Sequence, residues 1–279
     1  MFQLGQVLKG AASSYKISEK LYRTVWKAVN QQTEQTVVVK YDANHSHLKN
    51  EIDKLRRFQK RTRHIRPLID EIGMSNEDNV PALVLKWLDD DILNTTKSRQ
   101  LTRVELKRVS RGILEALKVI HEDGFIHTDV KPMNVLVNYS PSDGEITDIQ
   151  LADLAAVTHE DSQDAIDGKV LMCLIYGDGF CIFSPDVSVD HEEYTGRILW
   201  RHNEFLGPFP LSYMEIAPDH ILGFLACIIE NTTEYKPFRN ITKRELSDED
   251  KAFLLKILKL DPRDRPTVKE LLADEWFST

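Results

Sequence analysis

Two short segments hold the side chains of this 279-residue chain whose types and spacing could do chemistry. The first reads FIHTDVKPMNVLV over residues 125–137 and places Asp129 and Asn134 five positions apart. The second reads LADLA over residues 151–155 and carries Asp153. An aspartate can accept or orient the proton of a hydroxyl group, and carboxylate and amide oxygens are the ligands that a hard divalent cation prefers. Together these side chains could provide a proton acceptor and a cation site.

The order HTDVKPMN, then an apolar strand, then Asp-Leu-Ala, resembles the catalytic loop and metal-binding triplet of protein kinases. Because Thr128 stands where most kinases have arginine, the loop looks like that of SR-protein kinases and their fungal relatives. The resemblance implies that Asp129 is the catalytic base or orienter and that Lys131 neutralises the transferred phosphoryl group. It also implies that Asn134 and Asp153 bind Mg²⁺.

An upstream strand carries a second part of this resemblance. Lys40 ends the run VVVK, which resembles the strand that supplies the phosphate-binding lysine of kinases, and Glu51 lies on the inward edge of the next predicted helix. The resemblance implies a Lys40–Glu51 ion pair, with Lys40 contacting ATP. A separation of eleven positions is short for the family and predicts a short connecting loop. Taken alone, either residue is as easily an exposed charge.

Residues 83–88, LVLKWL, resemble the kinase hinge strand, whose backbone amide and carbonyl groups would pair with adenine. The resemblance assigns nucleotide contacts to Leu85, Lys86 and Leu88. Trp87 in the same run could equally be a core residue.

The elements that would position these residues follow from periodicity. Runs rich in valine, threonine and tryptophan, bounded by polar turns, predict strands, and the last of them is almost wholly apolar, which indicates burial. Leu48, Ile52, Leu55 and Phe58 form one stripe of a helix over residues 46–59. The predicted strands cover residues 15–17, 24–29, 36–40, 65–74 and 81–87. We therefore expect a five-stranded antiparallel sheet with one helix.

After about residue 100 the pattern becomes helical. Thr102 and Glu105 form a capping box before a long apolar stripe, Thr267 and Glu270 repeat the motif, and Ser247 begins a further helix. The predicted fold is a bilobal α+β protein-kinase-like domain in which residues 1–88 form the N-lobe and residues 89–279 a mainly helical C-lobe. The nucleotide is expected in the cleft between the lobes.

The segment LDPRDRPT, residues 260–267, resembles the part of kinases that precedes the last helix. In protein kinases, the arginine at the position of Arg265 pairs with a buried glutamate from elsewhere in the chain. This tail separates protein kinases from small-molecule phosphotransferases, so the resemblance covers nearly the whole chain. We expect His127 to support the catalytic loop by packing. Asp164 or Asp167 could replace the helix aspartate that usually braces this loop, but the alignment there is loose.

The family's glycine-rich loop is missing. Ser18, Lys20 and Arg23 occupy the three glycine places. Glycine lets backbone amides approach phosphates closely, so side chains here weaken that cradle, although Lys20 and Arg23 could supply charge instead. The alternative is a plain hairpin turn that touches no nucleotide.

The interval after Asp153 is also short. Only residues 154–168 precede the next apolar helix, expected to begin near residue 169, and the interval holds no APE-type segment. Ala155 replaces the glycine of the usual triplet. Burying Arg265 without a carboxylate would cost several kcal/mol, so another acid should serve or the arginine should stay hydrated.

Composition limits the partners. With 36 Lys+Arg against 44 Asp+Glu the net charge is −8, which argues against nucleic-acid binding as the main role, and a pI of about 5.6 favours basic partners only weakly. Three cysteines without CxxC spacing, Cys173, Cys181 and Cys227, suit a reducing compartment and no zinc site.

The apolar runs 170–176 and 222–229 are too short to span a membrane and are interpreted as buried helices. The first ten residues show no secretory signal. We expect an intracellular, cytoplasmic or nuclear, monomeric protein.

Two functions fit these observations. The first is an enzyme that transfers the γ-phosphoryl group of ATP to serine or threonine of a protein substrate, with weak activity because the peptide platform is reduced. The second is a pseudokinase that binds nucleotide or docks a partner. A third possibility is a shortened gene model or splice form of an active enzyme.

Overall fold

The computed structural model describes all residues except 1, 43–44, 74–79, 160–181, 189 and 279. The expectations for Cys173, Cys181, Asp164 and Asp167, and for the helix near residue 169, lie outside the described residues. The chain divides into two compact units, Met1–Thr95 with Thr102–Asp164 and Thr96–Leu101 with Ala165–Thr279. Every residue for which the sequence predicts a catalytic, nucleotide or metal role belongs to the first unit.

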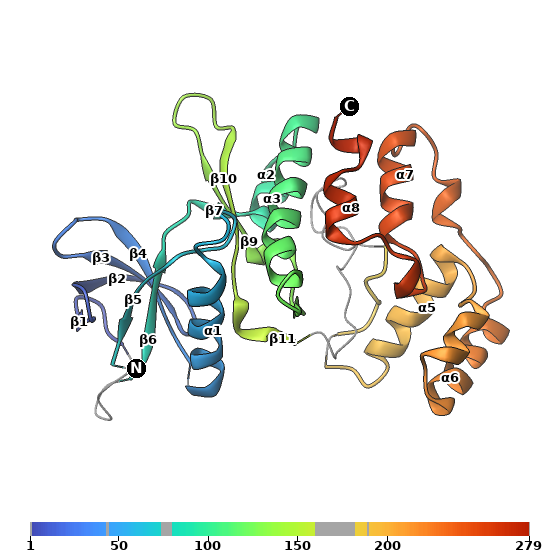
Figure 1. The fold of residues 1–279 in the computed structure, drawn as a ribbon, viewed down its shortest axis with the longest axis horizontal. Coiled ribbons are helices and arrows are strands. Elements are labelled where there is room, and N and C mark those ends of the chain that lie inside the picture. Colours follow the sequence, from blue (N-terminus) through green and yellow to red (C-terminus); the bar gives the residue numbers. More distant parts are fainter. Residues whose placement is uncertain (1, 43–44, 74–79, 160–181, 189, 279) are drawn as a thin grey trace. The chain divides into compact units, whose positions relative to one another are not determined.

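The first unit begins with a curled antiparallel sheet (Figure 1). Among the described residues it has six strands in the order β1-β2-β3-β4-β6-β5, one more than the five predicted. The additional strand is β1, which is only three residues long. The strands are β1 (Val7–Lys9), β2 (Ser14–Tyr22), β3 (Val25–Asn30), β4 (Thr36–Tyr41), β5 (Leu68–Ile72) and β6 (Ala82–Lys86).

A buried carboxylate on β5 explains why the sixth strand forms. Asp70 accepts hydrogen bonds from the backbone amides of residues 11–13, at 3.1, 2.9 and 3.1 Å, and from the hydroxyl of Tyr15 at 2.9 Å. These bonds hold the turn between β1 and β2 against β5. The contact joins residues almost sixty positions apart, so no local pattern announces it.

Gly10 lets the two ends of the sheet meet. It forms an isolated antiparallel bridge with Ile72 of β5. A Cβ atom at Gly10 would lie 2.3 Å from Oδ2 of Asp70, so a side chain there would displace the carboxylate. The first and last strands in the sheet order are therefore tied together.

Helix α1 (His45–Phe58) contacts β5 and β6, as Figure 1 shows. The predicted stripe is confirmed, because Leu48, Ile52, Leu55 and Phe58 are all at most 2% exposed. Glu51 is also 2% exposed, although it carries a charge. A buried carboxylate on an otherwise apolar helix face requires a charged partner.

The rest of the first unit is built on α3 (Arg103–His121), whose predicted Thr102–Glu105 capping box is present. Helix α3 contacts the hairpin of β9 (Val135–Tyr139) and β10 (Ile146–Leu151), and the short β7 (Asp90–Asp91) extends that hairpin. Two short strands, β8 (Phe125–His127) and β11 (Val157–His159), pair with each other. Helix α2 (Ile92–Ser98) precedes α3.

The described elements of the second unit are helical. Its described helices are α5 (Tyr194–Leu206), α6 (Asp219–Asn231), α7 (Asp248–Ile257) and α8 (Val268–Leu272), with short 3₁₀ turns between them. Ser247 caps α7, and the Thr267–Glu270 capping box starts α8. Among the described residues, no helix combines the length and apolar character needed to cross a membrane.

Helix α6 corrects one expectation. Residues 222–229 are helical, but within α6 only Leu225 and Ile228 are buried, and Phe224 is 44% exposed. The helix therefore packs along one stripe. An apolar run of this length does not distinguish a fully buried helix from one that packs on a single side.

We expect Asp70→Ala to destabilise the protein by about 3 kcal/mol, because it leaves three backbone amides and one hydroxyl without their charged acceptor. Urea denaturation followed by circular dichroism measures the change. Asp53→Ala, at an exposed position on α1, serves as the control and should shift the free energy of unfolding by less than about 0.5 kcal/mol. Equal effects of the two substitutions would contradict the anchoring role of Asp70.

Candidate active site

One ammonium group lies between two carboxylates from different elements. Nζ of Lys40, on β4, is 2.9 Å from Oε2 of Glu51 on α1 and 2.7 Å from Oδ1 of Asp153, which follows β10. The Lys40–Glu51 ion pair implied by the resemblance is therefore present in the structure. The bond from Lys40 to Asp153 joins the sheet to the segment that follows the hairpin.

The three charges support one another. Burial lowers the pKa of Lys40, but Glu51 and Asp153 outweigh burial, so the pKa is raised overall. Burial raises the pKa of Glu51, and Lys40 opposes that change. Burial also raises the pKa of Asp153, but Lys40 outweighs it and the pKa is lowered overall. Lys40 and Asp153 therefore stay charged at neutral pH.

The hairpin brings Asn134 and Asp153 together. Val135, the first residue of β9, pairs with Leu151, the last of β10, so the residues beyond both strand ends are neighbours. The backbone N–H of Ala152 donates to the carbonyl of Asn134 at 2.8 Å. Asp153 then adopts a left-handed backbone conformation, with φ 62° and ψ 62°. Such a conformation costs about 1–3 kcal/mol in a residue other than glycine, so its surroundings must hold it.

Asp129 is held by its own loop. Its Oδ2 accepts from Nζ of Lys131 at 2.7 Å and from Nδ2 of Asn134 at 3.0 Å. Nδ2 of Asn134 also donates to the carbonyl of Asp129 at 2.9 Å. These bonds use the Asn134 amide nitrogen and leave its oxygen available as a ligand within the described part of the chain.

His127 packs against the loop of Asp129 and hydrogen-bonds to it, as predicted. It is 4% exposed, and its Nδ1 accepts from the backbone N–H of Asp129 at 3.3 Å. The proton must then be on Nε2, which donates to the carbonyl of Ala152 at 3.2 Å. Burial lowers the pKa of His127, so the ring is neutral at pH 7. One neutral imidazole thus links the loop to the segment that carries Asp153.

Helix α1 holds that segment through a residue that the sequence did not indicate. Nδ2 of Asn50 donates to the carbonyl of Ala155 at 2.6 Å and lies 3.4 Å from that of Val157. Its only sequence signal is its position next to Glu51. Ala155 takes no positive φ, so the alanine fits where the family has glycine.

The hinge-like run ends β6. Leu85 and Leu88 are buried, and the backbone N–H of Lys86 donates to the carbonyl of Pro67 at 3.1 Å. The carbonyl of Lys86 accepts from Nε of Arg66 at 2.9 Å. Arg66 did not stand out in the sequence, since one arginine among several in residues 56–66 carries no signal.

The β2–β3 hairpin places side chains where the family has glycines. Lys20 lies over the ring of Trp26 at 5.4 Å, and Arg23 over that of Tyr22 at 5.8 Å. Both cations thus contact aromatic rings of their own hairpin. The hydroxyl of Ser18 donates to the carbonyl of Lys27 at 3.1 Å.

Trp87 and Arg265, which the sequence analysis also singled out, make specific contacts. Trp87 is only half-buried, with Nζ of Lys27 4.4 Å from its ring centroid. In the second unit, the half-buried Arg265 donates from Nε to the carbonyl of Lys259 at 2.6 Å and from Nη2 to that of Leu260 at 3.3 Å.

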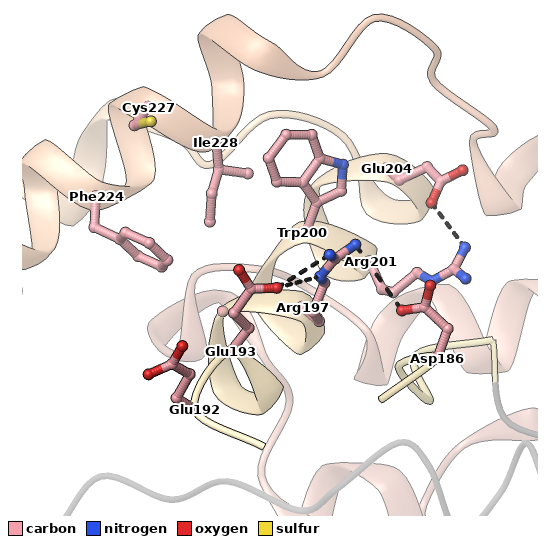
Figure 2. A pocket seen from close by; sticks show the side chains of 11 residues that line it. Asp186, Glu192, Glu193, Arg197, Trp200, Arg201, Glu204, Phe224, Cys227 and Ile228 are labelled. Atoms are coloured by element: carbon pink, nitrogen blue, oxygen red, sulfur yellow. Dashed lines mark hydrogen bonds and ion pairs between the residues drawn. The ribbon is translucent and has the colours of Figure 1, made fainter. Parts of the chain in front are cut away.

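The second unit contains a pocket of about 710 Å³ (Figure 2). Helices α5 and α6 supply its apolar part, which includes Trp200 and Phe224. Arg197 pairs with Glu193 at 3.0 Å along its wall. Its two arginines pair with carboxylates of the same wall, Arg197 with Glu193 and Arg201 with Glu204, and it holds none of the residues with a predicted chemical role.

Lys40→Met is expected to raise the pKa of Asp153, because burial then acts without the nearest cation. In the wild type the folded pKa lies below the ordinary value of 3.8, so the stabilisation it contributes is complete well above pH 4 and is lost as the pH falls through the folded value. Carboxyl ¹³C NMR titration measures both proteins. Lys16→Met, at an exposed position on β2, is the control; an unchanged Asp153 titration in Lys40→Met would contradict the assigned cause.

Comparison with known proteins agrees with this geometry. Relatives include "Cyclin-dependent kinase 12" of Caenorhabditis elegans, 24% identical over 94% of this chain and 40% of that protein. "Extracellular signal-regulated kinase 2" of Dictyostelium discoideum is 29% identical over 44% of this chain and 35% of that protein. "Mitogen-activated protein kinase HOG1" of Gibberella zeae is 26% identical over 70% and 57%. The chain thus spans less than two thirds of these relatives.

A family model described as "Protein kinase domain" matches residues 17–170, more than half of the chain. The match includes most of β2, all of β3 to β6, α1, the loop of Asp129 and the segment of Asp153. The predicted α+β protein-kinase-like fold is confirmed. The chain belongs to the protein kinase family.

Proposed function

We propose that the chain transfers the γ-phosphoryl group of ATP to a serine or threonine hydroxyl of a protein substrate. The observation that carries this proposal is the position of Lys40, bonded to both Glu51 and Asp153. A kinase needs this lysine for the phosphates, and needs its αC-type glutamate to orient it. The family match and the names of the relatives agree with a protein kinase.

The donor set fits Mg²⁺. This cation binds through one or two carboxylates together with water and phosphate oxygens, and Asp153 and Asn134 supply one carboxylate and one amide oxygen. When bound, Mg²⁺ would neutralise charge on the phosphates. Lys40 would contact the α- and β-phosphates and so move part of its bonding from Asp153 to the nucleotide.

Asp129 would orient the attacking hydroxyl. Lys131 and Asn134 both bond its Oδ2, which fixes the carboxylate plane and leaves Oδ1 for the substrate within the described part of the chain. Lys131, which pairs with Asp129 at 2.7 Å, would neutralise charge on the transferred group. We propose slow turnover, because in the sequence only residues 154–168 separate Asp153 from the next apolar run, and positioning of the peptide supplies much of the rate in phosphoryl transfer.

A second candidate is a pseudokinase that binds nucleotide or docks a partner. The β2–β3 hairpin favours it, because three side chains replace the glycines that would let amides approach the phosphates. The likeness to SR-protein kinases, the monomeric state and the cytoplasmic or nuclear compartment remain predictions.

Binding of ATP with Mg²⁺ should stabilise the protein. At 100 times the dissociation constant the expected gain is about 2.7 kcal/mol, or several degrees in melting temperature. Differential scanning fluorimetry measures this shift with and without Mg²⁺. Asp153→Asn should reduce the Mg²⁺-dependent part, whereas Asp143→Asn, on the exposed β9–β10 turn, should not. Absence of any shift in the wild type would exclude the enzyme.

Asp129→Asn should retain ATP binding but slow phosphoryl transfer by about 10²–10⁴-fold, because the hydroxyl loses its proton acceptor. Transfer of labelled γ-phosphate to serine- and threonine-containing basic peptides measures the rate. Binding by the wild type with transfer no faster than in Asp129→Asn would favour the pseudokinase.

A further inference from the structure

Arg66 is a cation that the proposed reaction does not use. It interacts electrostatically with two members of the Lys40 cluster, which consists of Lys40, Glu51 and Asp153. Its backbone N–H donates to the carbonyl of Leu151 at 3.0 Å, and Ile65 forms a parallel bridge with the same residue. Leu151 is the last residue of β10, two positions before Asp153. The backbone of Arg66 is thus fixed beside the segment that carries the candidate metal ligand.

The side chain of Arg66 extends to the end of β6. Its Nε donates to the carbonyl of Lys86 at 2.9 Å, and the guanidinium interacts electrostatically with Glu51 and Asp153. Burial lowers the pKa of Arg66 to about 10, and the two carboxylates oppose that change, so the group is charged at neutral pH. Its charge therefore lies between the hinge-like strand end and the Lys40 cluster.

This position matters for the purine base. Lys86 belongs to the run whose backbone amide and carbonyl groups the kinase resemblance assigns to adenine, and in the structure its carbonyl already accepts from Arg66. The Nη atoms of Arg66 have no hydrogen-bond acceptor among the described residues. The N–H groups of a guanidinium form a rigid fork of hydrogen-bond donors. The 6-amino group of adenine is also a donor, so it cannot accept a hydrogen bond from this fork.

A 6-oxopurine presents the opposite pattern. Guanine and hypoxanthine carry acceptors at O6 and N7, which an arginine fork can bind in a bidentate manner, with discrimination of about fivefold to a hundredfold over the wrong base. A polar site of this kind also rejects a ligand that leaves its donors unpaired.

We infer that Arg66 makes this nucleotide site prefer 6-oxopurine triphosphates, such as GTP and ITP, over ATP. The inference rests on the proposed function, because it concerns the base of the same bound nucleotide. Arg66 is a specificity-determining residue in this scheme and takes no part in phosphoryl transfer.

Isothermal titration calorimetry with GTP, ITP and ATP, each with Mg²⁺, tests the preference. In the wild type, GTP and ITP should bind at least about fivefold more tightly than ATP. ITP should be close to GTP because the 6-oxo group is what the two share. Arg66→Met should abolish or reverse the preference, and Arg66→Lys, which keeps the charge but loses the fork, should retain only part of it.

Arg63→Met is the matched control, since Arg63 is an exposed arginine on the same loop, and it should keep the wild-type ratio. Tighter binding of ATP than of GTP by the wild type, or an unchanged ratio in Arg66→Met, would overturn the inference and leave the proposed function standing. No binding of any triphosphate by the wild type would overturn both. Should Arg66→Met fail to fold, the wild-type ratio and Arg66→Lys decide the question.

Discussion

The candidate site depends on a single half-buried ammonium group, that of Lys40. Removing a lysine from water is costly, and in this protein two carboxylates from two other elements offset that cost. Since Glu51 is on α1 and Asp153 follows β10, Lys40 fixes the sheet, the helix and the hairpin relative to one another. The arrangement that we propose for phosphate binding is thus also the one that pairs the buried carboxylate of Glu51.

The loop of Asp129 is attached to this cluster through backbone groups. His127 and Asn134 each link it to Ala152, the residue before Asp153. Asn50 holds the other side of Asp153 through the carbonyl of Ala155. Hydrogen bonds on both sides therefore keep Asp153 in its left-handed conformation. The residue in this strained conformation is the one whose carboxylate bonds Lys40 and is proposed as a metal ligand.

Local patterns predicted the local parts of this protein. The apolar stripe of α1, the three helix starts and the order of residues around Asp129 each depend on neighbours within a few positions. The sixth strand was missed because Asp70 holds residues 11–13 across the sheet, which no window along the sequence contains. Arg66 was missed for the same reason, since it lies in a loop and its partner Lys86 is 20 positions away at the end of β6. Resemblance supplied the Lys40–Glu51 pair, whereas the bond from Lys40 to Asp153 emerged only from the structure.

The bridge between Gly10 and Ile72 also affects how the protein behaves toward other chains. An antiparallel sheet normally ends in strands whose unpaired amides and carbonyls can recruit a strand from another molecule. Here β1 and β5, which would be those ends, are joined by the bridge and by the hydrogen bond from Ala11 to the carbonyl of Glu71. This bridge and this hydrogen bond therefore occupy part of the strand edge at which another molecule could add a strand. Such protection against aggregation is not required by any catalytic role.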